Sequence, residues 1–203
     1  MGDLKGYQAQ VIRDGIPQRR AGLFPPNDDF LNMLGNLGWK PCTKGLPHRT
    51  VDGGYEFATA EGSWVAGEHA IEHGMDLRWF IKEGFEDQTL TAAVRFSADA
   101  MVGRGLATSI HGGAVETCLD EATAELAKSK LFPLATTAKI DFKISKPLEP
   151  NVTYRVYCHV LSENVKGISY DVAGEITDAA QDSVKYATCV AKMANPHALL
   201  NVN

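Results

Sequence analysis

The sequence lacks the features that mark several large classes of protein. No stretch of its 203 residues approaches the roughly 18 apolar residues that a membrane-spanning helix needs, and residues 1–20 contain no apolar core of a secretory signal. Basic residues do not predominate, since the net charge is −5, and a nucleic-acid-binding surface is therefore not indicated. These absences predict a protein of the cytoplasm, with an organelle matrix as the alternative.

Motifs for several kinds of chemistry are also missing. The four cysteines include no C-x-x-C pair, so neither a zinc knuckle nor a disulfide framework is predicted. There is no G-x-S-x-G nucleophile elbow and no Rossmann or P-loop glycine pattern. Residues 69–73 do match H-x-x-E-H, but Gly67 and Gly74 bound them too closely for a stable metal-binding helix. We therefore predict no metal site and no bound cofactor.

The residue pattern of the chain changes near residue 54. Residues 1–53 are interrupted by prolines, and we predict an N-terminal extension whose short helix begins after Asn27 or Asp28. The apolar side of this helix would consist of Phe30, Leu31, Leu34 and Leu37. Residues 54–203 are predicted to form a single domain.

A long helix followed by strands is predicted within that domain. The helix follows His111, and Thr108 or Ser109 is expected to cap its start. Its apolar stripe recurs at helical spacing and consists of Val115, Cys118, Leu119, Ala122 and Leu126. Four strand-like segments come after Pro133, over residues 134–144, 152–161, 168–177 and 183–193. Because their linkers are short, we expect antiparallel hairpins and an α+β fold in which the helix packs on the sheet.

The segment from His111 to Asp120 is the strongest candidate for a functional site. Gly112 and Gly113 stand together at the helix start, where two glycines are costly unless the backbone must approach another group closely. Free N–H groups at a helix N-terminus stabilise negative charge, such as the charge on a thioester oxygen under attack. Asp120 projects about 140° from Val115, at ~100° per residue. On periodicity alone a solvated helix face is the simpler interpretation, because other acidic residues lie nearby.

A resemblance that extends beyond this segment favours a functional role for Asp120 over a solvated helix face. His-Gly-Gly with a carboxylate nine residues after the histidine resembles the signature of hotdog-fold acyl-CoA thioesterases, in particular their PaaI-like and Them-type branch. Residues 136–143 with Lys146-Pro147-Leu148 resemble that family's strand after the helix, and residues 187–192 resemble part of its last hairpin. The resemblance implies a curved antiparallel sheet wrapped around one long central helix. It also implies homodimers, or dimers of dimers (homotetramers), with each active site between subunits.

The resemblance further implies hydrolysis of an acyl-CoA to free acid and CoA, in lipid metabolism. Asp120 would be the nucleophile or the general base for water. The turn of His111, Gly112 and Gly113 would be the oxyanion site, with the Gly112 N–H polarising the carbonyl and His111 positioning the carbonyl or the turn. Coenzyme A is then part of the substrate and not a cofactor. A hydroxyl on the following strand would assist, and the candidates are Thr136 and Thr137. The lysines placed near strand ends, where they could meet the CoA phosphates, are Lys143, Lys146 and Lys166.

Two other functions on the same fold stay open. A non-catalytic acyl-CoA sensor or scaffold would keep the pocket without needing the carboxylate of Asp120. An enoyl-thioester hydratase or dehydratase would use a histidine with an acid in a different local pattern. An assay of free thiol distinguishes these functions, because a thioesterase releases thiol and the other two do not.

Overall fold

The computed structural model describes residues 22–42, 47–49, 55–57, 68–82, 89–102, 109–130, 135–165 and 168–196. The helices in these ranges are α2 (Asp29–Asn36), α3 (Glu68–Glu72) and α4 (Gly112–Lys130), and a 3-10 turn, η1, covers Ala98–Ala100. The strands are β1 (Trp39–Cys42), β2 (Pro47–Arg49), β3 (Tyr55–Phe57), β4 (Met75–Lys82), β5 (Thr89–Phe96), β6 (Met101–Val102), β7 (Ser109–Ile110), β8 (Thr136–Ile144), β9 (Thr153–Val165), β10 (Ser169–Asp178) and β11 (Lys185–Ala194). None of the described helices has the length and apolar character needed to cross a membrane.

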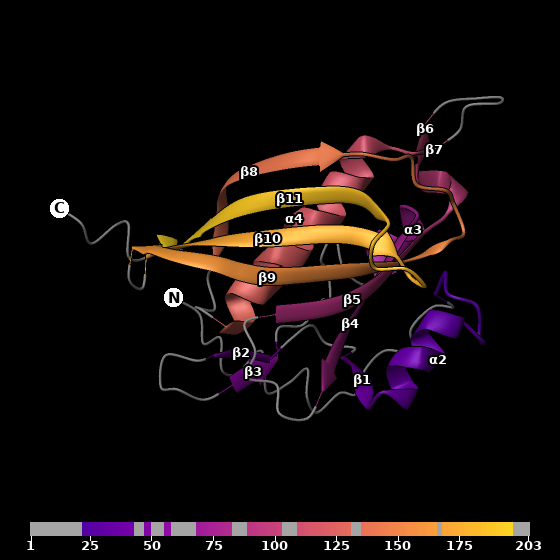
Figure 1. Cartoon of the computed structure of the whole chain (residues 1–203), viewed down its shortest axis with the longest axis horizontal. Coiled ribbons are helices and arrows are strands. Elements are labelled where there is room, and N and C mark those ends of the chain that lie inside the picture. Colours follow the sequence, from indigo (N-terminus) through magenta and orange to yellow (C-terminus); the bar gives the residue numbers. More distant parts are fainter. Residues whose placement is uncertain are drawn as a thin grey trace.

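One large antiparallel sheet carries the fold (Figure 1). Its strand order is β1-β4-β5-β9-β10-β11-β8, and β2–β3 and β6–β7 form two small separate sheets. Helix α4 runs across the inner face and contacts β5, β9, β10, β11 and β8. The predicted α+β hotdog arrangement, a curved antiparallel sheet around one long helix, is therefore confirmed.

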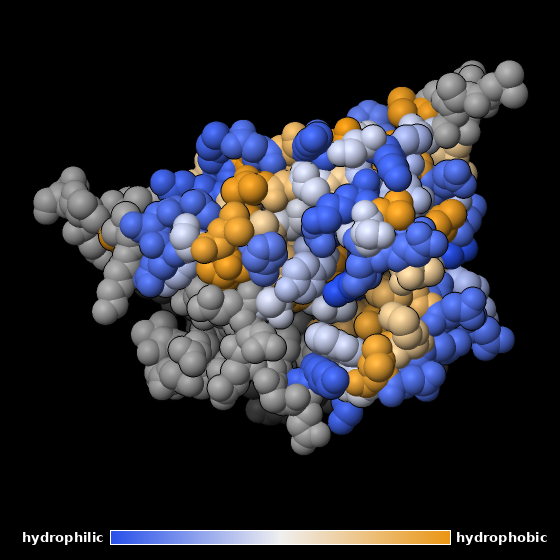
Figure 2. All heavy atoms as spheres, in the orientation of Figure 1, coloured by the Kyte–Doolittle hydropathy of each residue, from blue (hydrophilic) through white to orange (hydrophobic). Residues whose placement is uncertain are grey.

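The core lies between α4 and the sheet, because the apolar residues of each recur at the spacing that places them on one face. The predicted helix stripe is buried, with at most 1 % of any of its side chains exposed. From the sheet, the alternate residues Tyr154, Val156 and Cys158 of β9 point inward and are equally buried. In the view of Figure 1 the strands lie in front of the helix, so Figure 2 shows the outer face, where hydrophilic and hydrophobic patches are mixed. Leu161 of β9 and Val190 of β11 are about half exposed.

The place of β8 differs from the prediction. We expected β8 and β9 to form a hairpin, but β8 pairs with β11 at the edge of the sheet. The reason is that β9 has no free edge, since β5 and β10 occupy its two sides. The linker therefore crosses the end of the sheet, where the Leu148 side chain is buried and its carbonyl accepts the Ile110 N–H at 2.9 Å. The hairpins β9–β10 and β10–β11 are confirmed.

The short N-terminal helix packs on the outer face of the sheet. Asp28 caps α2 by accepting the Leu31 N–H at 3.0 Å, as one of the two predicted alternatives. A second apolar cluster joins this helix to β4 and β5 and consists of Phe24, Phe30, Leu34, Phe80 and Ala93. Strand β1, which follows α2, pairs with β4. Part of the expected extension thus belongs to the main sheet.

A prediction concerns Gly174 of β10, which lies close to Thr123 of α4. A Cβ at this position would lie 3.0 Å from Cys189 Sγ, 3.1 Å from Thr123 Cγ2 and 3.3 Å from Cys158 Sγ. We expect Gly174→Ala to lower the free energy of unfolding by about 1–3 kcal/mol, because the added methyl overpacks a filled core. Urea denaturation measures this change.

The matched control is Gly35→Ala in α2, where nothing lies within 4 Å of the added Cβ. This change should leave stability equal or raise it by up to about 1 kcal/mol, since alanine favours helix over glycine. Equal stability of the two variants would contradict the close approach at Gly174.

Candidate active site

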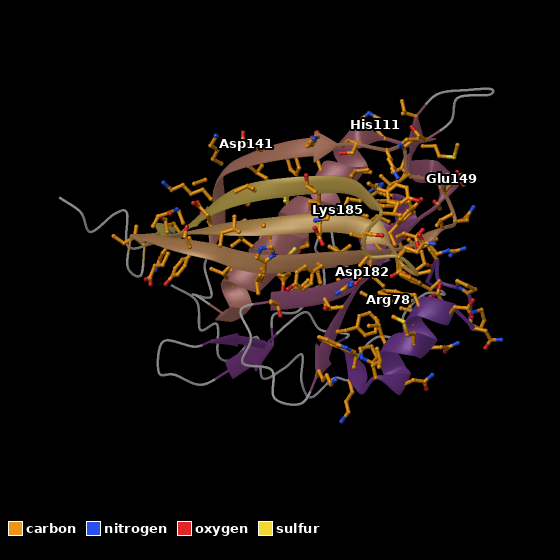
Figure 3. All side chains as sticks on the ribbon, in the orientation of Figure 1. Arg78, His111, Asp141, Glu149, Asp182 and Lys185 are labelled. Carbon is orange, nitrogen blue, oxygen red and sulfur yellow. The ribbon has the colours of Figure 1, made fainter. Side chains whose placement is uncertain are left out.

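The hydrogen bonds that start α4 converge on His111. The His111 N–H donates to the Ala100 carbonyl at 2.8 Å, just after the β6–β7 ribbon. Its own carbonyl accepts the N–H groups of Ala114 and Val115, at 2.9 and 3.3 Å. Its ring atom Nδ1 accepts the Gly113 N–H at 2.9 Å. Both the backbone and the ring of His111 are therefore fixed at the helix start (Figure 3).

The cap of α4 is a different residue from the one predicted. Ser109 lies in β7, where it pairs with Val102, and the helix begins only at Gly112. Its hydroxyl therefore cannot cap the helix, and the imidazole of His111 takes this place. Thr108, the other predicted cap, lies outside the described residues.

The two glycines of the turn serve different purposes. A Cβ on Gly113 would lie 3.1 Å from His111 Nδ1, so a larger residue would displace the ring. A Cβ on Gly112 would meet only Ile144 Cδ1 at 3.4 Å, which is an ordinary contact. Among the described residues, the Gly112 N–H has no hydrogen-bond acceptor.

Asp120 is joined to the sheet by a short hydrogen bond. The Thr137 hydroxyl donates to Asp120 Oδ1 at 2.6 Å, and both side chains are half-buried. The register of β8 against β11 shifts between Lys139 and Thr137, which is a β-bulge. The bulge turns Thr137 toward α4, on the same side as Ile140, and such bulges commonly re-aim side chains beside functional sites. The carboxylate is thereby held in one orientation at the edge of the sheet.

The other predicted residues lie apart from this pair. Thr136 is exposed, and its hydroxyl is 3.5 Å from the Ala194 carbonyl. Lys143 on β8 and Lys146 in the linker after it are exposed. Lys166 lies outside the described residues. Of the two candidate hydroxyls, the structure thus brings only that of Thr137 to Asp120.

A cavity of about 440 Å³ opens beside the glycine turn. Its small and apolar lining residues come from five elements, α3, β4, η1, β6 and α4, and its polar groups include the exposed side chains of His73 and Asp99. The lining residues are Ala70, His73, Met75, Asp99, Ala100, Met101, His111, Gly113, Ala114 and Thr117. Sequence reasoning missed this cavity, because no local pattern connects α3 and η1 with the start of α4.

Within one chain, the glycine turn and the carboxylate are well separated. Gly112 and Asp120 are eight residues apart on one continuous helix, which places them about 12 Å apart along its axis. A reacting carbonyl must lie roughly 3 Å from both its hydrogen-bond donor and its nucleophile. One carbonyl therefore cannot contact the Gly112 amide and Asp120 of the same chain.

The described cysteines do not offer a competing nucleophile. Burial raises the pKa of the Cys189 thiol to about 12, with a further increase from the charge of Asp120. Burial also raises the pKa of the Cys118 and Cys158 thiols, and the neighbouring thiols add to the effect. All three are therefore protonated at neutral pH and pack as small apolar groups.

Comparisons with known proteins give a similarity of fold at low identity. No family model and no curated protein matches the sequence at a significant level. Among solved structures, the PaaI protein from the phenylacetic acid degradation operon of Escherichia coli is 18 % identical, with a TM-score of 0.48 over 60 % of this chain and 82 % of that chain. The acetyl-CoA-bound smu.793 protein of Streptococcus mutans is 17 % identical, with a TM-score of 0.47 over 54 % and 82 %. Zebrafish thioesterase superfamily member 2 is 10 % identical, with a TM-score of 0.49 over 58 % and 80 %.

Proposed function

We propose that this protein hydrolyses an acyl-CoA thioester to a free acid and CoA. The observation that carries the proposal is the half-buried Asp120 carboxylate, which the Thr137 hydroxyl holds at 2.6 Å. A second group supports it, namely the Gly112 N–H that no described residue uses. Together they supply a base or nucleophile and a donor for the carbonyl oxygen, which are the two requirements of acyl transfer.

Two copies of the chain are proposed to complete each site. Because one carbonyl cannot contact Gly112 and Asp120 of a single chain, the amide of one copy would act with the carboxylate of another. Strand β8 is the edge of the sheet and carries Thr137, so its free backbone groups offer a surface for a second copy close to Asp120. The proposed assembly is a homodimer or a dimer of dimers.

The proposed reaction has two possible courses with the same products. Asp120 adds to the acyl carbon, and a water molecule then hydrolyses the anhydride, or Asp120 takes a proton from a water molecule that adds directly. In both courses the Gly112 N–H stabilises the charge on the carbonyl oxygen, the C–S bond breaks, and the CoA thiolate takes up a proton. The cavity beside the turn would hold the acyl group. Lys143, Lys146 and Lys166 remain proposals for the phosphates of CoA.

A thiol-release assay over a panel of acyl-CoA chain lengths tests the function. A thioesterase frees CoA thiol from at least part of the panel. Binding of the CoA esters without turnover would instead indicate the sensor or scaffold. A change in enoyl absorbance without free thiol would indicate a hydratase or dehydratase, and both results would overturn the proposal.

A prediction separates the two neighbouring threonines. Thr137→Val keeps the shape of the side chain but removes the donor to Asp120, so we expect kcat/KM to fall roughly 10-fold, the value of one hydrogen bond to a charged group. Thr137→Ser keeps the hydroxyl and should retain most of the activity. The matched control is Thr136→Val, which removes an exposed hydroxyl and should change little. Equal losses in Thr136→Val and Thr137→Val would contradict the assigned role.

A further inference from the structure

The cavity beside the glycine turn has walls that backbone hydrogen bonds hold in place. Gly74 follows α3 with a φ of +89°, and its carbonyl accepts the Ser97 N–H at 2.8 Å. A Cβ at Gly74 would lie only 2.7 Å from the backbone nitrogen of Ala100 in η1, so a side chain is not accommodated there. The Ala100 carbonyl in turn accepts the His111 N–H at 2.8 Å. Because α3, η1 and α4 are joined in this way, the cavity that they line is preformed.

The lining of the cavity is suited to a flexible aliphatic group. Its apolar side chains are the small Ala70, Ala100 and Ala114 and the unbranched Met75 and Met101. None of the described lining residues is Phe, Tyr or Trp, so a planar ring would find no aromatic side chain to pack against. Methionine side chains adapt to the shape of their neighbours. A straight hydrocarbon chain, which has many conformations, therefore fits this wall better than an aromatic ring.

The volume of the cavity limits the length of such a chain. At roughly 30 Å³ per non-hydrogen atom, the share of one water molecule in the liquid, the 440 Å³ would hold about 15 atoms. His73, Asp99 and His111 are exposed lining residues, so the cavity is open to solvent and a chain fills only part of it. An acetyl group would leave most of the apolar wall in contact with water. Chains of intermediate length thus bury the most apolar surface.

We propose that this cavity selects straight-chain acyl groups of about 8–12 carbons, with Ala70 and Met101 as specificity-determining residues. The lining includes Gly113 and Ala114, so a chain held there starts next to the Gly112 N–H. Ala70 on α3 is buried and Met101 on β6 is half-buried, and both lie outside the glycine turn. The inference rests on the proposed function for the CoA ester, but the cavity would bind the free acid as well.

Two opposite changes of cavity volume test this selection. Ala70→Leu fills part of the cavity, and Met101→Ala enlarges it. We expect the optimum of kcat/KM to move by about 2–3 carbons, to shorter chains in Ala70→Leu and to longer chains in Met101→Ala, since each buried CH₂ group changes kcat/KM about fourfold. The matched control is Ala98→Leu, at an exposed position of η1 that does not line the cavity, and it should keep the wild-type profile.

The chain-length profiles also define the results that would overturn the inference. The first is a wild-type preference for acetyl-CoA or phenylacetyl-CoA over decanoyl-CoA. The second is an unchanged optimum in both cavity variants, with thermal unfolding showing that they are folded. If Ala70→Leu does not fold, Met101→Ala decides alone, because its side chain is only half-buried and its loss is better tolerated.

Calorimetric titration of the full-length protein with straight-chain alkanoic acids measures the same selection without turnover. We expect the tightest binding at about 8–12 carbons in the wild type, and the same opposite shifts in Ala70→Leu and Met101→Ala. If these shifts occur but the wild type releases no thiol, the proposed hydrolysis fails and the inference about the cavity stands. Equal affinity for all chain lengths would overturn the inference even if the protein is a thioesterase.

Discussion

Replacement of Asp120 by asparagine is expected to lower kcat for thioester hydrolysis on the order of 10²-fold or more, which corresponds to about 3 kcal/mol or more of barrier. The amide has the same size and can still accept the Thr137 hydroxyl, so the local structure should persist. The asparagine amide, however, can act neither as the nucleophile nor as the base. The measurement is thiol release at saturating acyl-CoA, with thermal unfolding to confirm that the variant is folded.

The matched control is Glu116→Gln, which removes a carboxylate from the exposed position one turn earlier on α4. This change should leave kcat within about twofold, because a charge in solvent contributes little. Near-normal turnover by Asp120→Asn would remove Asp120 from the proposed mechanism. A large loss in both variants would show that the effect comes from net charge and not from the position of the carboxylate.

Asp120→Asn, combined with a second variant, Gly112→Pro, also tests whether two copies of the chain share one site. Gly112→Pro removes the N–H at the first position of α4, where proline is well tolerated. Both single variants should be inactive, but in a mixed dimer the intact Gly112 of one chain meets the intact Asp120 of the other. Activity should therefore reappear when the two inactive variants are co-expressed. No recovery in a proven mixed dimer would place both groups of each site in one chain.

The parts that could be predicted from the sequence are those fixed by local periodicity. The buried stripe of α4 follows from apolar residues at helical spacing, and α2 follows from its cap at Asp28 and its apolar side. The glycine turn was singled out by two glycines at a helix start, whereas Asp120 was proposed only because its spacing from His111 resembles a known family signature, since periodicity alone favoured a solvated helix face. Their separation of eight residues also follows from the sequence, since a helix rises about 1.5 Å per residue.

The parts that could not be predicted depend on contacts between distant segments. The edge position of β8 is decided by β5, which takes the place beside β9 that a hairpin would need. Thr137, and not Thr136, contacts Asp120 because of a bulge in β8 against β11. In a strand, a shift of one residue exchanges the side chains that face the helix with those that face away from it. The capping role of His111 requires the ring to fold back on its own turn, which a search for Ser or Thr overlooks.

The stability of the fold should depend most on the contact between α4 and the sheet. Leu126 on α4 is fully buried and belongs to the main core. We expect Leu126→Ala to lower the free energy of unfolding by about 2–5 kcal/mol, because the lost burial adds to the cavity left behind. The site lies toward the start of the helix, so at a temperature where the variant is folded its turnover should change little. Denaturant unfolding and thiol release measure the two effects separately.

Leu161→Ala is the matched control, since it makes the same change in β9 at a position where the side chain is 51 % exposed. Its expected cost is under about 0.5 kcal/mol. The difference between the two leucines isolates burial under α4 from the change of residue type. A loss at Leu126 as small as that at Leu161 would mean that the end of α4 does not pack on the sheet. The position of Asp120 on the same helix would then have no rigid support.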